Sequence, residues 1–168
     1  PGGPYLRKAP CQWGWDWGPK LPPIGIWKDA WLKGYSAARL DNVHIRQDHQ
    51  FDGSVTVSAA ATLSKWEETH LQLCLTLQDP NGKTFATTCK FLDGSATASI
   101  EISEPLLWWP NGYGDPHLYQ AKVSLRTEEE ITLDERDYQL GLRTLALKQE
   151  PDDFGESFTF VVNGVSIF

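Results

Sequence analysis

The 168-residue sequence contains no methionine, no long apolar run and no basic cluster. No stretch approaches the roughly 20 apolar residues that cross a bilayer, and no basic segment precedes an apolar one as in a signal peptide. The formal net charge is -7, without the Lys/Arg footprint that phosphate binding requires. We therefore expect a soluble protein that binds neither nucleic acid nor a membrane. The lack of methionine and the apolar end at Phe168 favour an internal piece of a longer protein.

Chemically reactive motifs are also scarce. Cys11, Cys74 and Cys89 are odd in number and lack metal-ligand spacing, so neither a disulfide framework nor a zinc site is indicated. The sequence has no Gly-x-Ser-x-Gly elbow and no glycine-rich phosphate loop. His44 and His70 alternate with apolar neighbours, which favours solvent-facing strand positions over catalysis or metal binding. We expect no cofactor and no metal.

What the sequence does contain, from Tyr35 onward, is a period-two alternation of apolar and polar residues. This period is typical of strands with one buried face, and no segment shows a sustained helical period. The expected strands are 38–46, 55–61, 71–77, 84–91, 96–102, 118–126 and 131–142. Short strands separated by turn signals at this spacing predict an all-β fold, an immunoglobulin-like antiparallel β-sandwich.

The clearest turn is DPNGK at residues 79–83, because Asn-Gly accepts positive φ between two strands. A hairpin symmetric about Asn81 and Gly82 would place Cys74 and Cys89 opposite each other. That register sets the phenylalanines of one strand and the leucines of the other on different faces, so a bulge or a switch of sheet could intervene. A disulfide between the two cysteines is not expected.

The two ends do not fit a sandwich. The segment before Tyr35 is rich in Pro, Gly and Trp and predicts one strand, 26–32. An acidic linker, QEPDDFGE, precedes an apolar hairpin, 158–168, that turns at Asn163-Gly164. We expect the end of a preceding domain at 1–34, the sandwich at 35–146, and a linker with the first hairpin of a following domain at 147–168.

The segment QWGWDWGPKLPPIGIW, residues 12–27, concentrates tryptophan around one carboxylate. Rings that face sugar C–H groups and a carboxylate that accepts hydroxyl hydrogen bonds are typical of carbohydrate recognition, and Trp15, Asp16 and Trp17 supply both. Tryptophans that fill a domain interface, with Asp16 capping a turn, explain the same residues. The residue types alone leave both interpretations open.

A family resemblance favours the first. RKAPCQWGWDWGPKLPPIGIWKD (7–29) closely resembles the segment that closes the sugar-binding-like jelly-roll domain of β-mannosidases in glycoside hydrolase family two. LLWWPNGYGDPHLY (106–119), LGLRTL (140–145) and FTFVVNGVSIF (158–168) resemble landmarks of that family's immunoglobulin-like domain and of the entry to its catalytic TIM barrel. They occur in the family's order, so the resemblance spans nearly the whole chain.

The resemblance implies that Trp15, Asp16 and Trp17 bind the terminal mannose at the barrel mouth, with Arg7 as a possible supporting residue. Retaining glycosidases need two carboxyl groups roughly 5–5.5 Å apart. In this family both are glutamates of the barrel, one following an asparagine, and no Asn-Glu pair occurs here. We therefore expect both catalytic residues beyond Phe168. The acidic run Glu128–Glu130 is interpreted as a solvated turn.

The resemblance predicts part of a retaining exo-β-mannosidase whose substrate is a β-mannoside and whose sandwich contacts the barrel within one molecule. The fragment alone should be inactive. Family members are cytoplasmic, periplasmic, secreted or lysosomal, so the compartment is open. The alternatives are relatives that act on another sugar (exo-β-glucosaminidase, β-galactosidase or β-glucuronidase) and a non-catalytic carbohydrate-binding or interaction module. The Leu-Trp-Trp-Pro motif, 107–110, is expected to pack rather than to bind sugar.

Overall fold

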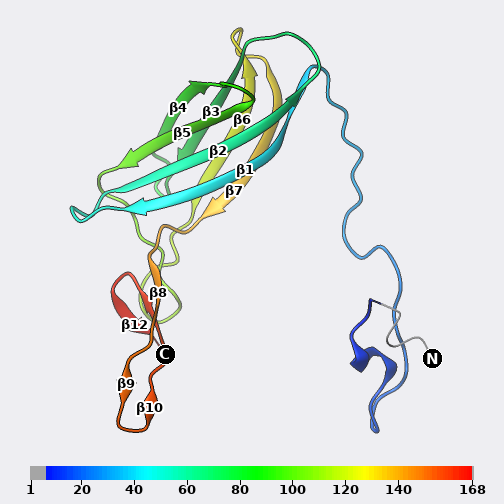
Figure 1. The fold of residues 1–168 in the computed structure, drawn as a ribbon, viewed down its shortest axis with the longest axis vertical. Coiled ribbons are helices and arrows are strands. Elements are labelled where there is room, and N and C mark those ends of the chain that lie inside the picture. The colour runs from blue at the N-terminus through cyan, green and yellow to red at the C-terminus, as the bar shows by residue number, and fades with distance from the viewer. Residues whose placement is uncertain (1–6, 168) are drawn as a thin grey trace. The chain divides into compact units, whose positions relative to one another are not determined.

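The computed structural model describes residues 7–167; residues 1–6 and Phe168, which belong to the two predicted terminal segments, lie outside the described residues. The chain divides into two compact units between Gly34 and Tyr35. The larger unit contains the strands (Figure 1). The expected all-β class is confirmed, because the one helix of the described residues is a four-residue 3-10 turn, η2 (Pro10–Trp13).

Seven strands form two antiparallel sheets that face each other. One sheet has the order β1-β2-β5 and the other β4-β3-β6-β7. Their bounds are β1 Ala38–His49, β2 Val55–Lys65, β3 Leu71–Gln78, β4 Thr84–Lys90, β5 Ser95–Ile102, β6 Tyr119–Thr127 and β7 Thr132–Leu140. Each expected strand of the sandwich is present at its predicted place.

The core lies between the two sheets because the alternation of each strand turns one face inward. Val57 on β2 and Leu73, Leu75 and Leu77 on β3 are fully buried, while Gln72 and Thr76 lie half-buried and Cys74 is buried on the other face of β3. β5 alternates without exception, with Ala96, Ala98, Ile100 and Ile102 buried. Burial of aliphatic side chains on both inner faces is the main stabilising contribution to such a sandwich.

Three hydrogen bonds to backbone groups also hold the sandwich together. The hydroxyl of buried Tyr119 accepts a hydrogen bond of 2.9 Å from the amide of Leu106, and burial raises the pKa of Tyr119. Between the edge strands of the two sheets, Asp134 of β7 accepts a 3.0 Å hydrogen bond from the amide of Leu40 in β1. Arg136 donates to the carbonyl of the same leucine at 2.9 Å. These bonds satisfy backbone groups that strand pairing leaves free.

The hairpin between β3 and β4 corrects one expectation. Leu73 pairs with Cys89, and Cys74 pairs with Thr88, so the predicted Cys74–Cys89 register was wrong by one residue. The loop is centred on Asn81, because the carboxylate of Asp79 accepts bonds of 2.8 Å from the amides of Asn81 and Lys83. This register puts the apolar residues of both strands on one face. The two cysteines point to opposite faces and are free.

The strand predicted at 26–32 is wrong. The structure has no strand there, and the apolar side chains Ile26, Trp27, Trp31 and Leu32 are exposed. The described residues of the smaller unit include no other strand that could pair with this segment. An extended segment without a neighbour cannot satisfy its backbone groups as a sheet does, so the sequence pattern alone does not make a strand.

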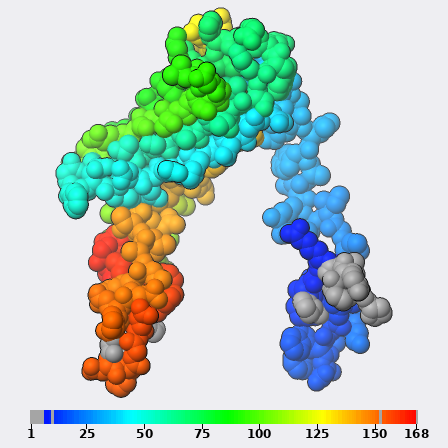
Figure 2. Space-filling view, viewed as in Figure 1, coloured from blue at the N-terminus to red at the C-terminus, as the bar shows by residue number. Residues whose placement is uncertain are grey.

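The chain leaves the sandwich through β8 (Leu145–Lys148), and the predicted apolar hairpin is formed by β11 (Thr159–Val162) and β12 (Val165–Ile167). Its turn residues Asn163 and Gly164 have φ of 49° and 79°, as expected for Asn-Gly. β8 pairs with β11, which gives a three-stranded sheet of order β12-β11-β8. We call it the C-terminal sheet, and Figure 2 shows it in orange and red as a lobe distinct from the sandwich. A small ribbon, β9 (Pro151–Asp152) with β10 (Gly155–Glu156), lies between β8 and β11 in sequence.

Candidate functional site

The loop predicted to bind substrate follows η2. That helix ends at Trp13 and is capped by Gly14, whose amide donates to the carbonyl of Cys11 at 3.2 Å. Gly14 has φ of 98°, and a Cβ there would lie 2.7 Å from Cγ of Lys20, so glycine is required at this turn. A second turn follows, in which the amide of Gly18 donates to the carbonyl of Trp15 at 3.2 Å. Two successive turns therefore present residues 15–17 at a tight corner.

At this corner the rings of Trp15 and Trp17 stack on each other. Their centroids are 5.3 Å apart and their planes differ by 13°. The two residues are 60% and 81% exposed, and Asp16 between them is also exposed. Trp13, by contrast, is half-buried. The structure thus brings the three predicted binding residues together as an accessible aromatic surface with an adjacent carboxylate.

Arg7, the predicted supporting residue, is exposed. Among the described residues, no ion pair or hydrogen bond joins it to Asp16. The neighbouring Lys8, which the sequence did not single out, has the clearer structural role. Its ammonium donates to the carbonyl of Pro23 and, at 3.4 Å, to the side chain of Gln12. Nothing in the sequence signals this contact, because it joins residues far apart along an irregular segment.

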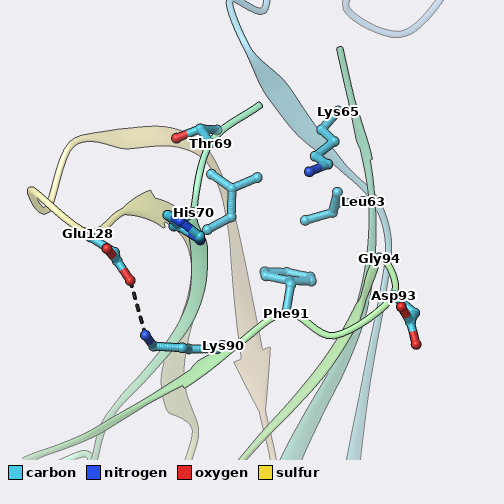
Figure 3. A pocket seen from close by; sticks show the side chains of 10 residues that line it. Leu63, Lys65, Thr69, His70, Lys90, Phe91, Asp93, Gly94 and Glu128 are labelled. Carbon is cyan, nitrogen blue, oxygen red and sulfur yellow. Dashed lines mark hydrogen bonds and ion pairs between the residues drawn. The ribbon is translucent and has the colours of Figure 1, made fainter. Parts of the chain in front are cut away.

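The larger unit has a cavity of about 490 Å³ at one end of the sandwich (Figure 3). Leu63, Leu71 and Phe91 line its apolar part. At its rim the ammonium of Lys90 lies 3.1 Å from the carboxylate of Glu128, and this hydrogen bond lowers the pKa of Glu128. A general acid needs the opposite shift. Glu128 is therefore a paired surface carboxylate, as expected from its place in the acidic turn.

The Leu-Trp-Trp-Pro motif lies in the same unit, where the sandwich meets the C-terminal sheet. The amide of Trp108 donates to the carbonyl of Leu142 at 2.9 Å, and Leu142 is buried. The ring lies so close to Gly141 that a Cβ there would be 2.8 Å from Cγ of Trp108. Trp109 is half-buried. Packing rather than an exposed binding face accounts for Trp108.

No three His, Cys, Asp or Glu side chains in residues 7–167 lie close enough together to hold a metal ion. No helix in that range is long and apolar enough to cross a membrane.

The fold and the loop together define the class of protein. The profile of "Glycosyl hydrolases family 2" matches residues 38–143, which include all seven sandwich strands. The profile of "Glycosyl hydrolase 2 galactose-binding domain-like" matches residues 1–28, which contain the Trp15–Trp17 loop. The chain belongs to glycosyl hydrolase family 2.

Within this family the chain is similar to β-mannosidases. It is 42% identical to Beta-mannosidase B of Neosartorya fischeri over 97% of the chain and 19% of that protein. The structure of a β-D-mannosidase from Dictyoglomus thermophilum superposes with a TM-score of 0.80 at 29% identity, over 96% of this chain and 20% of that one. A β-glycosidase from Bacteroides vulgatus gives 0.63 at 26% identity, over 79% and 16%. The chain thus spans about a fifth of the length of these relatives.

Proposed function

We propose that this chain is an internal part of a retaining exo-β-mannosidase, which hydrolyses terminal, non-reducing β-D-mannose residues of β-mannosides. The observation that carries the proposal is the exposed Trp15–Trp17 stack with the exposed Asp16 between the two residues in sequence, in a chain similar to β-mannosidases over nearly its whole length. Stacked rings offer apolar faces to sugar C–H groups, and a carboxylate accepts hydrogen bonds from vicinal hydroxyls.

In this proposal Trp15, Asp16 and Trp17 bind the substrate and Arg7 supports them. The two catalytic glutamates of a retaining enzyme, one the acid/base and one the nucleophile, are supplied by sequence outside this chain. The 168-residue chain alone is therefore expected to be inactive. One carboxylate with two rings cannot offset the cost of desolvating and ordering a sugar.

We assign the chain to three parts of that enzyme. Residues 1–34 close the sugar-binding-like domain, 35–146 comprise the sandwich and the first residues of β8, and 147–168 link it to the catalytic barrel. Exposed apolar side chains support contacts with further sequence at both ends. Trp27 and Trp31 are exposed in the first part, and Phe158 and Phe160 in the last. Large apolar surfaces of this kind mark interfaces, here with the barrel of the same molecule.

The test uses the full-length parent enzyme and p-nitrophenyl glycosides. Asp16→Ala should lower kcat/KM for the β-mannoside by about 10- to 150-fold, the range for a lost hydrogen bond to a charged group, and leave Tm unchanged. Asp29→Ala is the matched control, because Asp29 is an exposed carboxylate of the same unit. Full activity of the Asp16 variant would exclude the binding role.

The same assay separates the sugars. Higher kcat/KM for a β-glucosaminide, β-galactoside or β-glucuronide than for the β-mannoside would replace mannose in the proposal. No hydrolysis of any glycoside by the full-length protein would leave a non-catalytic carbohydrate-binding module as the better interpretation.

A further inference from the structure

The connection between the sandwich and the C-terminal sheet is four residues long, 141–144, because β7 ends at Leu140 and β8 begins at Leu145. Such a connection between two sheets could be a flexible hinge. It is instead held from β1, where Gln47 accepts a hydrogen bond of 2.8 Å from the amide of Arg143. The same side chain donates to the carbonyl of Gly141 at 3.4 Å. Figure 1 shows this connection where β7 leads into β8.

Trp108 holds the connection from the loop that joins β5 to β6. Its amide bonds to the carbonyl of Leu142, and its ring packs on Gly141 where no Cβ would fit. The guanidinium carbon of Arg143 lies 4.8 Å from the centroid of the same ring. A cation over a tryptophan face is attractive, by about 0.5–1 kcal/mol at exposed sites. Segments 141–144, Gln47 and Trp108 therefore form one packed unit, which we call the joint.

Asn163, in the turn between β11 and β12, closes the joint from the C-terminal sheet. Its side-chain oxygen accepts a hydrogen bond of 2.9 Å from the amide of Thr144. Its side-chain nitrogen donates to the carbonyl of Trp108 at 3.0 Å. Its own amide donates to the carbonyl of Thr144 at 3.2 Å. One residue thus joins the hairpin, the connection and the loop that carries Trp108.

The turn by itself does not require these bonds. Asn163 has φ of 49°, and Gly, Asn and Asp are the residues that adopt this conformation most readily. Glycine has no side chain, and an ionised aspartate only accepts hydrogen bonds. Of these three, only asparagine both accepts and donates, as the amide of Thr144 and the carbonyl of Trp108 demand.

We propose that Asn163 is a positioning residue, whose carboxamide locks the C-terminal sheet to the Trp108 loop and so fixes one orientation of that sheet on the sandwich. Its effect on catalysis rests on the proposed function. In the parent enzyme the C-terminal sheet leads toward the barrel, and a catalytic constellation tolerates displacements of only about 0.5 Å. A loosened joint would misplace the barrel relative to the sandwich without touching the substrate.

The first test measures amide hydrogen exchange in the 168-residue chain. Asn163→Gly keeps the turn conformation and removes the carboxamide, so the Thr144 amide loses its acceptor and should exchange about tenfold faster. The Trp108 amide donates to the carbonyl of Leu142, so its exchange reports on the loop and should rise when Asn163 no longer holds the Trp108 carbonyl. Asn163→Asp keeps the acceptor for the Thr144 amide and loses the donor to the Trp108 carbonyl, so Thr144 should stay protected while the Trp108 amide exchanges faster through the loosened loop. The Val162–Val165 pair of the hairpin should stay protected in both variants. Unchanged rates at Thr144 and Trp108, or a uniform loss of protection in β11 and β12, would overturn the proposal.

The second test measures the full-length enzyme with p-nitrophenyl β-mannoside. Asn163→Gly should lower kcat about tenfold with KM within about twofold, and Asn163→Asp should be intermediate. A fully active Asn163→Gly enzyme would overturn the positioning role. A wild-type enzyme without mannosidase activity would instead refute the proposed function, while the exchange pattern would still decide whether the carboxamide locks the joint.

Discussion

Both units of the chain contain many large apolar residues, but only the larger unit buries them in a core. The smaller unit contains many large apolar residues, yet Trp17, Ile24, Trp27 and Leu32 are exposed, and the regular structure of its described residues, 7–34, is one short turn of helix. The larger unit buries valine, leucine and isoleucine between two sheets. The difference lies in the order of residues rather than in their hydrophobicity. A strict alternation creates two faces that can close on each other, and a Trp/Pro/Gly-rich segment creates none.

We therefore expect the exposed apolar side chains of the smaller unit to be buried only by contact with other parts of the protein. Its turns are defined by local bonds, such as those at Gly14 and Gly18, which set the shape of the loop without burying its rings. Local bonds of this kind suit a binding loop. They position Trp15 and Trp17 while leaving the rings accessible.

The largest difference between the two units is expected when one large side chain in each is truncated to alanine. Leu75→Ala removes a fully buried side chain of β3 and should lower the free energy of unfolding by about 2–5 kcal/mol. Trp27→Ala removes a larger side chain that is 84% exposed, and should change the free energy of unfolding by less than about 0.5 kcal/mol. Urea unfolding of the 168-residue chain measures both. A large loss for Trp27→Ala would mean that the smaller unit packs as a core.

A smaller effect is expected from the hydrogen bond that joins Tyr119 of β6 to the loop between β5 and β6. Tyr119→Phe leaves the amide of Leu106 without its acceptor, which should lower the free energy of unfolding by about 1–3 kcal/mol. Tyr138→Phe is the control, because Tyr138 is half-buried and no hydrogen bond of its hydroxyl occurs among the described residues. Equal effects of the two substitutions in urea unfolding would show that the Tyr119–Leu106 bond contributes nothing.

The smallest effect concerns the pH dependence of stability, through His49 near the joint of the larger unit. Burial lowers the pKa of His49 from 6.5, although the backbone of Arg143 and the charge of Asp48 oppose the shift. The unfolded chain therefore takes up a proton at higher pH than the folded chain. The contribution of His49 to stability is present above pH 6.5 and is lost as the pH falls through its folded-state pKa.

His49→Gln should thus flatten the loss of stability between about pH 7 and 5, measured as the free energy of unfolding at several pH values. His44→Gln, at an exposed position of the same strand, is the control. Identical pH profiles for wild type and His49→Gln would show that burial of the imidazole does not affect folding.

Much of the sandwich was predictable because its information is local. The alternation in segments such as 71–77 and 96–102 fixes which residues face inward, and each became a strand with that face buried. The Asn163-Gly164 turn was predictable for the same reason, since positive φ is a property of the residues themselves. In the proposed binding loop, the residue types Trp15, Asp16 and Trp17 could be recognised from the sequence, whereas the stacking of the rings could not.

The sequence by itself therefore determined the all-β class, the seven strands, their buried faces and the candidate binding residues. Tertiary structure alone decided the register that separates Cys74 from Cys89, the pairing of β8 with β11, and the contacts of Asn163. It also decided that 26–32 is not a strand. The reason is that periodicity and turn chemistry act between neighbours in sequence, while hydrogen-bond partners distant in sequence are chosen only when the sheets close.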